Sequence, residues 1–394
     1  MTDDRPLSVG LLTHSVNPRG GVVHTLSLGE ALRARGHRVT VFAPAQAGQS
    51  LFRATRCELA LVPVRAARGV VDMVAARRDA LAARVAAAHR ARPFDVLHAQ
   101  DAIGGNALAD LRERGAIDGF VRTVHHLDDF DDAKLAAWQA RAFTAATRVL
   151  CVGGLWCAHL REVHGIAATL VGNGVDLDRF SREPDPHDAF VGARLGLRPG
   201  APLLLAVGGV EARKNTLAVL EAFCALRAAR PGAQLVIAGG ASLLDHDAYG
   251  RRFAARLAAC GAARDVVLTG PVPDADLPAL LRLADVVLMP SLREGFGLVV
   301  LEALASGTPV VVSRRAPFTE YLSADEFADH ACWADPDDPS SIARAVERAC
   351  DPLHRLALAH ATPAVCRRHS WAASALAHEA IYRAHAGAPL PLPA

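Results

Sequence analysis

Short apolar runs alternate with longer amphipathic stretches along most of the chain. Residues 7–13, "LSVGLLT", predict a buried strand, and the apolar spacing from Val22 to Arg35 predicts a helix. A second strand, "RVTVFAP", follows, so this region forms a βαβ unit. The alternation recurs, with further strands expected at 95–101, 121–127 and 148–153. Repeated βα units of this kind predict a doubly wound parallel sheet.

A second series begins after residues 181–200, whose Pro, Asp and Gly content is typical of a join between domains. Its apolar runs predict strands at 202–209, 233–240, 265–271, 285–291 and 308–313. The predicted fold class is α/β, with two Rossmann-like doubly wound domains facing each other. We expect an N-terminal domain at 1–185, a C-terminal domain at 195–370, and a helix within 371–394 that packs back on the N-terminal domain.

The composition excludes several classes of protein. The 394 residues are 51% hydrophobic, which suffices for two cores, and the net charge of +2 gives no field that would attract nucleic acid. The eight cysteines form no Cys-x-x-Cys pair, which argues against a zinc knuckle and favours a reducing cytoplasm. Neither a signal peptide nor an apolar run of membrane-spanning length is recognisable. We therefore expect a cytoplasmic protein.

Residues 65–92 hold seven arginines against two aspartates. A basic amphipathic helix binds anionic membranes, so peripheral contact with the inner face of the membrane is one interpretation. A solvated helix face is the other, and it is the commoner outcome for a run of charges.

Two pairs of residues predict anion binding at the start of a helix. Gly20 and Gly21 follow the first strand, where backbone N–H groups approach a ligand closely. They lack the Gly-x-Gly-x-x-Gly fingerprint, which argues against a dehydrogenase, and a plain tight turn is the alternative. Arg213 and Lys214 stand between a strand and a helix and predict a diphosphate site, with exposed surface charge as the alternative.

Two glutamates, Glu294 and Glu302, flank the stretch "GFGLVVL". Glycines on both sides of Phe296 let the loop turn tightly, and a helix is expected from Leu298. The loop follows the predicted strand "DVVLMPS", at whose carboxyl end open α/β sheets bind ligands. One carboxylate can accept hydrogen bonds from ribose hydroxyls and the other from a sugar. Two ordinary helix glutamates are the alternative.

The run "HHLDDFDD" at 125–132 has two interpretations. It holds nitrogen and oxygen side chains that metals accept: His125, His126, Asp128, Asp129, Asp131 and Asp132. Consecutive histidines at a strand end point to opposite faces, however, so we expect no metal site. The favoured interpretation is that the acidic residues face the acceptor or cap the next helix.

The segment "VLMPSLREGFGLVVLEALASGTPVVVS" resembles the signature of the retaining glycosyltransferases of family 4. The Glu-x7-Glu spacing, the Gly-Phe-Gly loop and the Gly-Thr-Pro-Val-Val turn all match. "VGNGVDLDRF" (171–180) is similar to the family's segment at the domain join. The resemblance covers nearly the whole chain. It implies the GT-B fold, in which two Rossmann-like domains face a cleft that holds the active site.

The resemblance assigns roles in binding the donor's sugar and ribose. Glu302 would bind the ribose. Glu294 would hold the sugar, together with the backbone of Phe296, Gly297 and Leu298.

Other roles concern the diphosphate, the base and the reaction centre. Lys214 would neutralise the leaving diphosphate, helped by the backbone of Gly20 and Gly21. His125 matches a family histidine that contacts the donor sugar. Val272 would contact the base through its backbone.

Two positions depart from the family pattern, and the minor one is Gly172, where proline is usual. Gly209 stands where the family usually has an arginine, five residues before the lysine. Arg213, next to that lysine, is expected to supply the missing charge from another direction. The departure leaves the phosphate geometry and the donor preference open.

Together these roles predict a hexosyltransferase that moves a sugar from a nucleotide diphosphate sugar to an unidentified acceptor, with retention at the anomeric carbon. No metal and no cofactor beyond the donor substrate are expected, and no nucleic acid partner. A nucleotide-sugar epimerase, a sugar phosphorylase and a non-catalytic nucleotide-sugar binding protein are the alternatives. The acceptor (a small molecule, lipid or glycan), the base and the oligomeric state stay open.

Overall fold

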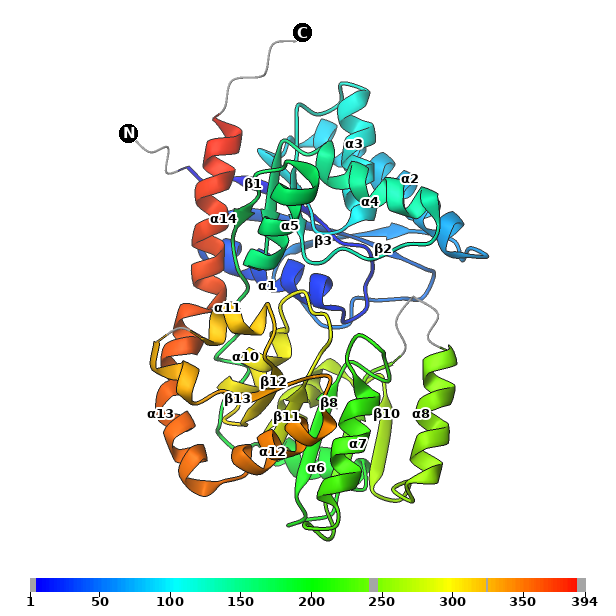
Figure 1. Ribbon diagram of the computed structural model, residues 1–394. Coiled ribbons are helices and arrows are strands. Elements are labelled where there is room, and N and C mark those ends of the chain that lie inside the picture. Colours follow the sequence, from blue (N-terminus) through cyan, green and yellow to red (C-terminus); the bar gives the residue numbers. More distant parts are fainter. Residues whose placement is uncertain (1–4, 241–246, 324, 388–394) are drawn as a thin grey trace. The chain divides into compact units, whose positions relative to one another are not determined.

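The computed structural model describes residues 5–240, 247–323 and 325–387, which form two compact units (Figure 1). Unit 1 comprises the described residues up to Asn173 and those from Trp371 onward, and unit 2 comprises those from Gly174 to Ser370. The chain enters unit 2 before the stretch that suggested a boundary at 185. That stretch holds α6 (Pro186–Arg194), which belongs to unit 2.

Unit 1 contains a seven-stranded parallel sheet in the order β3-β2-β1-β4-β5-β6-β7. Its strands are β1 (Ser8–Leu12), β2 (Arg38–Ala45), β3 (Glu58–Pro63), β4 (Val96–Ala99), β5 (Val121–Val124), β6 (Arg148–Cys151) and β7 (Thr169–Leu170). Its helices are α1 (Gly20–Ala34), α2 (Val70–Ala91), α3 (Ala102–Glu113), α4 (Ala133–Thr144), α5 (Gly154–His164) and α14 (Trp371–Ala386).

Unit 2 repeats the plan with a six-stranded parallel sheet in the order β10-β9-β8-β11-β12-β13. Its strands are β8 (Leu203–Val207), β9 (Gln234–Ala238), β10 (Val266–Gly270), β11 (Val286–Met289), β12 (Val310–Ser313) and β13 (Cys332–Ala334). Besides α6, its helices are α7 (Thr216–Leu226), α8 (Asp247–Ala259), α9 (Leu277–Leu283), α10 (Leu298–Ala305), α11 (Phe318–Leu322), α12 (Pro339–Ala349) and α13 (Pro352–Arg368), with 3-10 turns at Asp274–Asp276 and Asp325–Asp329.

The predicted fold class is confirmed, because each unit is a doubly wound parallel α/β domain. The strands are shorter than their apolar runs suggested. For example, β5 ends at Val124, so His125 lies beyond it. The sequence did not reveal β3, whose side chains alternate between buried and exposed, nor the very short β7 and β13.

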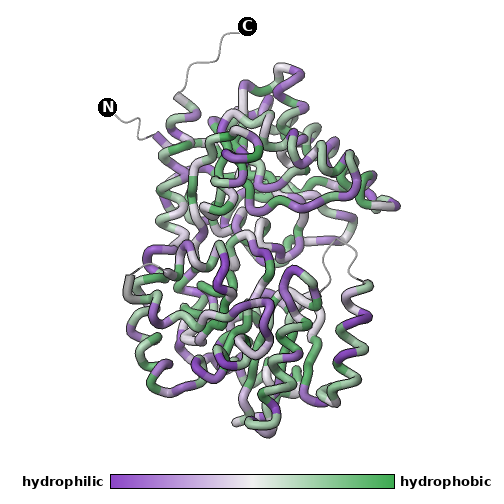
Figure 2. Tube along the Cα trace, in the orientation of Figure 1, coloured by the Kyte–Doolittle hydropathy of each residue, from purple (hydrophilic) through white to green (hydrophobic). Residues whose placement is uncertain are grey.

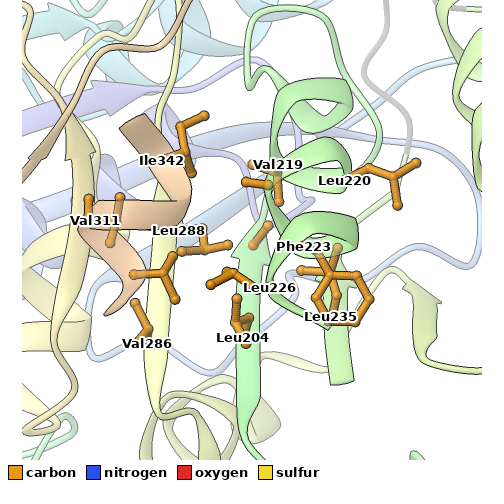
Figure 3. Close-up of a cluster of buried hydrophobic side chains, with 14 of the residues drawn as sticks. Leu204, Val219, Leu220, Phe223, Leu226, Leu235, Val286, Leu288, Val311 and Ile342 are labelled. Atoms are coloured by element: carbon orange, nitrogen blue, oxygen red, sulfur yellow. The ribbon is translucent and has the colours of Figure 1, made fainter. Parts of the chain in front are cut away.

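Each sheet is buried by apolar side chains from its own strands and covering helices. Figure 2 shows hydrophobic residues recurring along the backbone of both units. In unit 2, the sheet meets α7 and α12 in one cluster (Figure 3). Its members include Leu204, Leu235, Val286, Leu288 and Val311 from strands, with Val219, Phe223 and Ile342 from helices. Strands buried on both faces read as continuous apolar runs, which explains why the sequence predicted them.

The helices differ in whether a side chain accepts hydrogen bonds from the backbone N–H groups of the first turn. The carboxylates of Asp101, Asp132 and Asp338 accept backbone N–H groups at the starts of α3, α4 and α12. The helices α1, α7 and α10, at whose starts the sequence predicted ligand contacts, begin without a side-chain cap. The helices α2, α5, α9 and α11 also lack one, so a missing cap does not by itself mark a ligand site.

The last helix, α14, packs against α1 within unit 1 (Figure 1). Arg35 Nε, just after α1, donates to Glu379 Oε2 of α14 at 2.5 Å. Arg383 of α14 donates to the other oxygen of the same carboxylate at 2.6 Å. The C-terminal helix is therefore part of the N-terminal unit.

Candidate functional site

The order of strands in unit 2 reverses between β8 and β11, which are neighbours. Helices after such neighbouring strands lie on opposite faces of the sheet, and ligands of open α/β sheets bind outside the carboxyl ends of the two strands. The loop after β8 carries Arg213 and Lys214, and the loop after β11 carries Glu294. The topology therefore brings together residues about eighty positions apart in the sequence.

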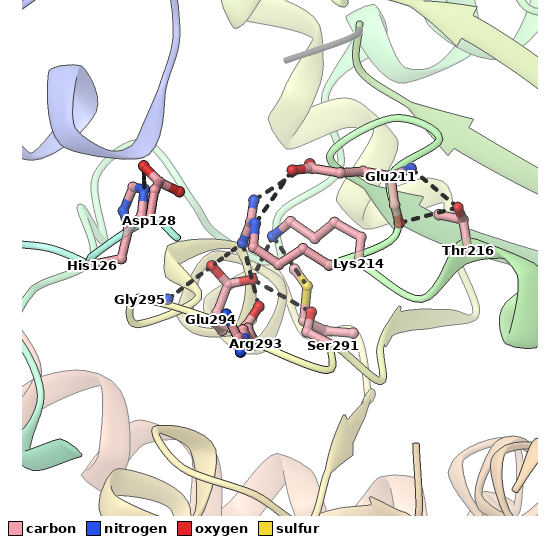
Figure 4. A network of polar contacts seen from close by, with 11 residues as sticks. His126, Asp128, Glu211, Lys214, Thr216, Ser291, Arg293, Glu294 and Gly295 are labelled. Carbon is pink, nitrogen blue, oxygen red and sulfur yellow. Dashed lines mark hydrogen bonds and ion pairs between the residues drawn. The ribbon is translucent and has the colours of Figure 1, made fainter. Parts of the chain in front are cut away.

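Glu294 is the centre of a charged cluster in these loops (Figure 4). Lys214 Nζ lies 2.5 Å from Glu294 Oε2, and Arg213 Nη1 lies 3.0 Å from Glu294 Oε1. The backbone N–H of Gly295 donates to Oε1 at 3.2 Å. Arg213 also pairs with Glu211 through its Nε at 3.3 Å. The positive charges of two cations are thus paired with the negative charges of two carboxylates in these neighbouring loops.

The electrostatics of this cluster keep Glu294 and Arg213 charged. Burial alone would raise the pKa of Glu294, but the attraction of Lys214 and Arg213 and the hydrogen bonds to the carboxylate lower it to about 2. Burial also opposes the charge on Arg213, yet Glu294 and Glu211 raise its pKa above the usual value. Lys214 is the more buried cation, with 13% of its side chain exposed against 35% for Arg213.

Gly209 has a structural reason to be glycine. Its φ is +78°, and a Cβ atom at this position would lie 2.7 Å from the carbonyl oxygen of Gly240. The N–H groups of Gly208 and Gly209 both donate to Ala238 O, at 2.7 and 3.0 Å. Two backbones therefore lie in close contact where the family usually has an arginine, and the side chain of Lys214 packs against the neighbouring Gly208.

The other residues predicted in unit 2 lie around α10 and β10. Phe296 is buried and stacks on Tyr321 with ring centroids 4.5 Å apart, and its carbonyl oxygen accepts the Tyr321 hydroxyl at 3.2 Å. Gly297 precedes α10 and Leu298 begins it, while Glu302 lies within it and is only 7% exposed.

Val272 follows β10, the edge strand. It is two strands away from β8.

In unit 1, the start of α1 and His125 are brought together. A Cβ atom on Gly21 would lie 3.7 Å from His125 Cδ2, so the imidazole rests against the first turn of the helix. At Gly20, a Cβ atom would meet no other side chain of the described residues within 4 Å. His24, one turn further along α1, meets His125 edge to face with centroids 4.7 Å apart.

These histidines are uncharged near neutral pH. Burial, together with the proximity of His24 and Arg122, holds the pKa of His125 well below 6.5. Burial likewise lowers the pKa of His24 to about 4, although its Nδ1 bonds to Asn173 Oδ1. A neutral imidazole can both donate and accept a hydrogen bond.

Sequence reasoning missed a row of buried polar side chains behind His125. Gln100, at the end of β4, contacts both His125 and His98, and His98 reaches Tyr382 of α14. His378 of α14 is also fully buried. The signal was present in "DVLHAQD", where His98 lies within the buried strand β4 and Gln100 directly follows it.

The run at 125–132 forms a loop and a helix cap. Asp132 accepts the N–H groups of Lys134 and Leu135 at the start of α4, which confirms the capping interpretation for this residue. Gln139 holds the backbone of Asp128 through two hydrogen bonds. Among the residues that the structure describes, no group of three or more histidine, cysteine, aspartate or glutamate side chains is arranged to hold a metal ion.

The arginine-rich segment forms α2, whose buried residues include Leu81 and Val85. Arg77 donates to the carbonyl oxygen of His14, and Arg78 pairs with Asp110 at 3.3 Å. Two of its arginines are thus engaged inside unit 1. No helix in the described ranges combines the length and the apolar character needed to cross a membrane.

Both halves of the chain match known glycosyltransferase families. The family described as Glycosyltransferase Family 4 matches residues 18–179, and Glycosyl transferases group 1 matches residues 192–352. D-inositol 3-phosphate glycosyltransferase 2 from Catenulispora acidiphila is 30% identical over 325 residues, which cover 76% of this chain and 73% of that protein.

Solved structures show the same fold at low sequence identity. Sucrose-phosphate synthase from Thermosynechococcus elongatus has a TM-score of 0.78 at 22% identity, covering 95% of this chain and 98% of that chain. HepE from Anabaena, in complex with UDP-glucose, has a TM-score of 0.75 at 16% identity, covering 95% and 99%. The chain therefore belongs to glycosyltransferase family 4 and is a glycosyltransferase with the two Rossmann-like domains of the GT-B fold.

Proposed function

We propose that this glycosyltransferase takes its sugar from a nucleotide diphosphate sugar and transfers it with retention of the anomeric configuration, without a metal ion. The observation that carries the proposal is the partly buried cluster of Lys214, Arg213 and Glu294 at the switch point of unit 2. Paired cations at this edge suit a diphosphate, because a departing diphosphate gains negative charge in the transition state.

The cluster suggests how the cations would act. Lys214 and Arg213 are already oriented by Glu294, so binding a diphosphate would require little reorganisation of their side chains. The donor's phosphate oxygens would share the cations with the carboxylate. Arg213, which is the more exposed of the two, would approach the phosphates first and can bind them through two N–H groups.

The names of the related proteins suggest which donor and which acceptor to test first. HepE was solved in complex with UDP-glucose, and the Catenulispora protein is named as a D-inositol 3-phosphate glycosyltransferase. We therefore propose UDP-glucose as the first donor to test and a phosphorylated polyol as the first class of acceptor. GDP- and ADP-sugars complete the donor set, because Glu302 would bind a ribose that all three nucleotides share.

The test is a transfer assay with each donor and inositol 3-phosphate, with and without EDTA. Proton NMR of the product gives the anomeric coupling constant, and its comparison with that of the donor gives the stereochemical outcome. Transfer with retention that EDTA leaves unchanged is expected. Inversion, or activity that requires a metal, would refute the corresponding part of the proposal.

The same assay separates the alternatives. A nucleotide-sugar epimerase would release nucleotide or change the sugar without any acceptor, and a sugar phosphorylase would require free phosphate. A protein that only binds nucleotide sugars would show saturable binding without turnover for any acceptor offered.

A further inference from the structure

The polar row behind His125 begins with Gln100, which is 2% exposed and lies at the end of β4. The backbone N–H of Gln100 donates to Leu12 O of β1 at 3.0 Å, so the position of this residue is set by the sheet. Its side-chain oxygen, Oε1, lies 3.0 Å from His125 Nε2. A rigid strand end thus presents one amide to the imidazole that the sequence predicted near the donor sugar.

The other end of the amide is also engaged. Gln100 Nε2 lies 3.3 Å from both ring nitrogens of His98. That ring is in turn fixed by two hydroxyl groups, Tyr382 at 2.6 Å from Nδ1 and Thr123 at 2.8 Å from Nε2. With the NH₂ group facing His98, the oxygen of Gln100 faces His125.

We infer that Gln100 is a positioning residue that holds His125 as the tautomer protonated at Nε2, which presents the lone pair of Nδ1 to a hydroxyl group of the sugar donor. An amide oxygen only accepts hydrogen bonds, so His125 Nε2 must carry the proton that it donates. Nδ1 is then the unprotonated nitrogen, and it has no hydrogen bond to any residue within the described ranges.

The surroundings of His125 favour this neutral acceptor. The titratable groups that act on it are His24 from α1, His98 from β4, and Arg122 and His126 from its own segment, all of which are bases. Bases and burial both disfavour an added proton on the ring. Glutamine suits this place because it orients the ring without the negative charge that a carboxylate would use to stabilise the imidazolium form.

The identity of the ligand in this inference rests on the proposed function, but the tautomer does not. Nitrogen-15 NMR of the histidine-labelled full chain distinguishes a protonated from an unprotonated ring nitrogen, and His125→Ala identifies the signals. The expected result is an Nε2-protonated His125 in the absence of donor. A ring protonated at Nδ1 would overturn the inference, even if the chain proves to be a retaining transferase.

Two variants then test the positioning role. Gln100→Leu removes the oxygen that accepts from His125, so both tautomers of the His125 ring should be populated. The value of kcat/KM should fall about tenfold, which is the effect of losing one oriented hydrogen bond. Gln100→Glu keeps the acceptor but adds a charge, which raises the pKa of His125, so the acidic limb of the kcat/KM profile should move upward by about one pH unit or more. The same changes at Gln49, in an exposed turn, are the matched controls.

The outcomes are distinguishable. An unshifted acidic limb in Gln100→Glu, or an unchanged tautomer in Gln100→Leu, would overturn the positioning role. If Gln100→Leu fails to fold, the tautomer of the wild-type chain and the profile of Gln100→Glu still decide. An Nε2-protonated His125 in a chain that transfers no sugar from any donor would instead refute the proposed function.

Discussion

The charged cluster predicts a specific dependence of stability on pH. Glu294 has a pKa of about 2 in the folded chain against a usual value of 4.5, because Lys214 and Arg213 outweigh the effect of burial. A group whose pKa is lowered on folding stabilises the fold above its unfolded pKa, and the contribution fades as the pH falls toward the folded value. The difference corresponds to about 3 kcal/mol at pH 7.

The perturbation is Glu294→Gln, which keeps the shape of the side chain and removes the charge. The variant should have a lower free energy of unfolding than the wild type at pH 7. This difference in free energy should narrow by about 1 kcal/mol at pH 4 and by about 2 kcal/mol at pH 3. Urea unfolding of the full chain, followed by circular dichroism at each pH, measures the gap. Glu347→Gln, an exposed site in unit 2, is the control and should show no such narrowing.

A gap that stays constant from pH 7 to pH 3 would mean that the carboxylate is not ionised against the two cations. A gap that widens at low pH would mean that burial dominates and that Glu294 is protonated in the folded chain. Either result would remove the basis for assigning Lys214 and Arg213 to a diphosphate.

Three further predictions concern unit 2. Lys214→Met should weaken binding of the preferred nucleoside diphosphate at least tenfold, as measured by calorimetry, because one buried cation is lost. Glu302→Ala should abolish the rise in melting temperature that this nucleotide causes with or without magnesium, and an undiminished rise would refute the ribose assignment. Gly209→Ala should lower the free energy of unfolding by about 1–3 kcal/mol more than Gly232→Ala, because both have positive φ but only Gly209 would strike Gly240. Equal losses of unfolding free energy in the two variants would contradict the steric explanation for glycine at position 209.

The fold was predictable because parallel strands buried on both faces leave continuous apolar runs, as in β11 and β12. Three of the four edge strands were not, since β3 is largely exposed, β7 has two residues and β13 has three, whereas the edge strand β10 was predicted. Loops that follow parallel strands gather at one edge, so the neighbourhoods of Gly21 with His125 and of Lys214 with Glu294 follow from topology.

The sequence did not predict which side chains contact each other within each of these sites. Arg213 and Glu294 were predicted to bind different parts of the donor, but in the structure they bind each other. Such a choice depends on side-chain distances that no local pattern encodes. The contact between Gln100 and His125 is similar, because it joins the ends of two strands twenty-five residues apart.

The charged cluster also bears on how Glu294 would take part in sugar transfer. A covalent double displacement requires a carboxylate that attacks the anomeric carbon, and nucleophilicity falls as a group becomes a weaker base. With a pKa of about 2 and two cations within 3.0 Å of its oxygens, Glu294 is a weak base whose charge is already shared. Desolvating charged groups is costly, and strongly shifted pKa values cluster at functional sites, so the position of these ion pairs at a switch point favours a role in ligand binding. Under the proposed function, Glu294 would therefore orient the cations and the sugar, and the stabilisation of the leaving diphosphate would fall to Lys214 and Arg213.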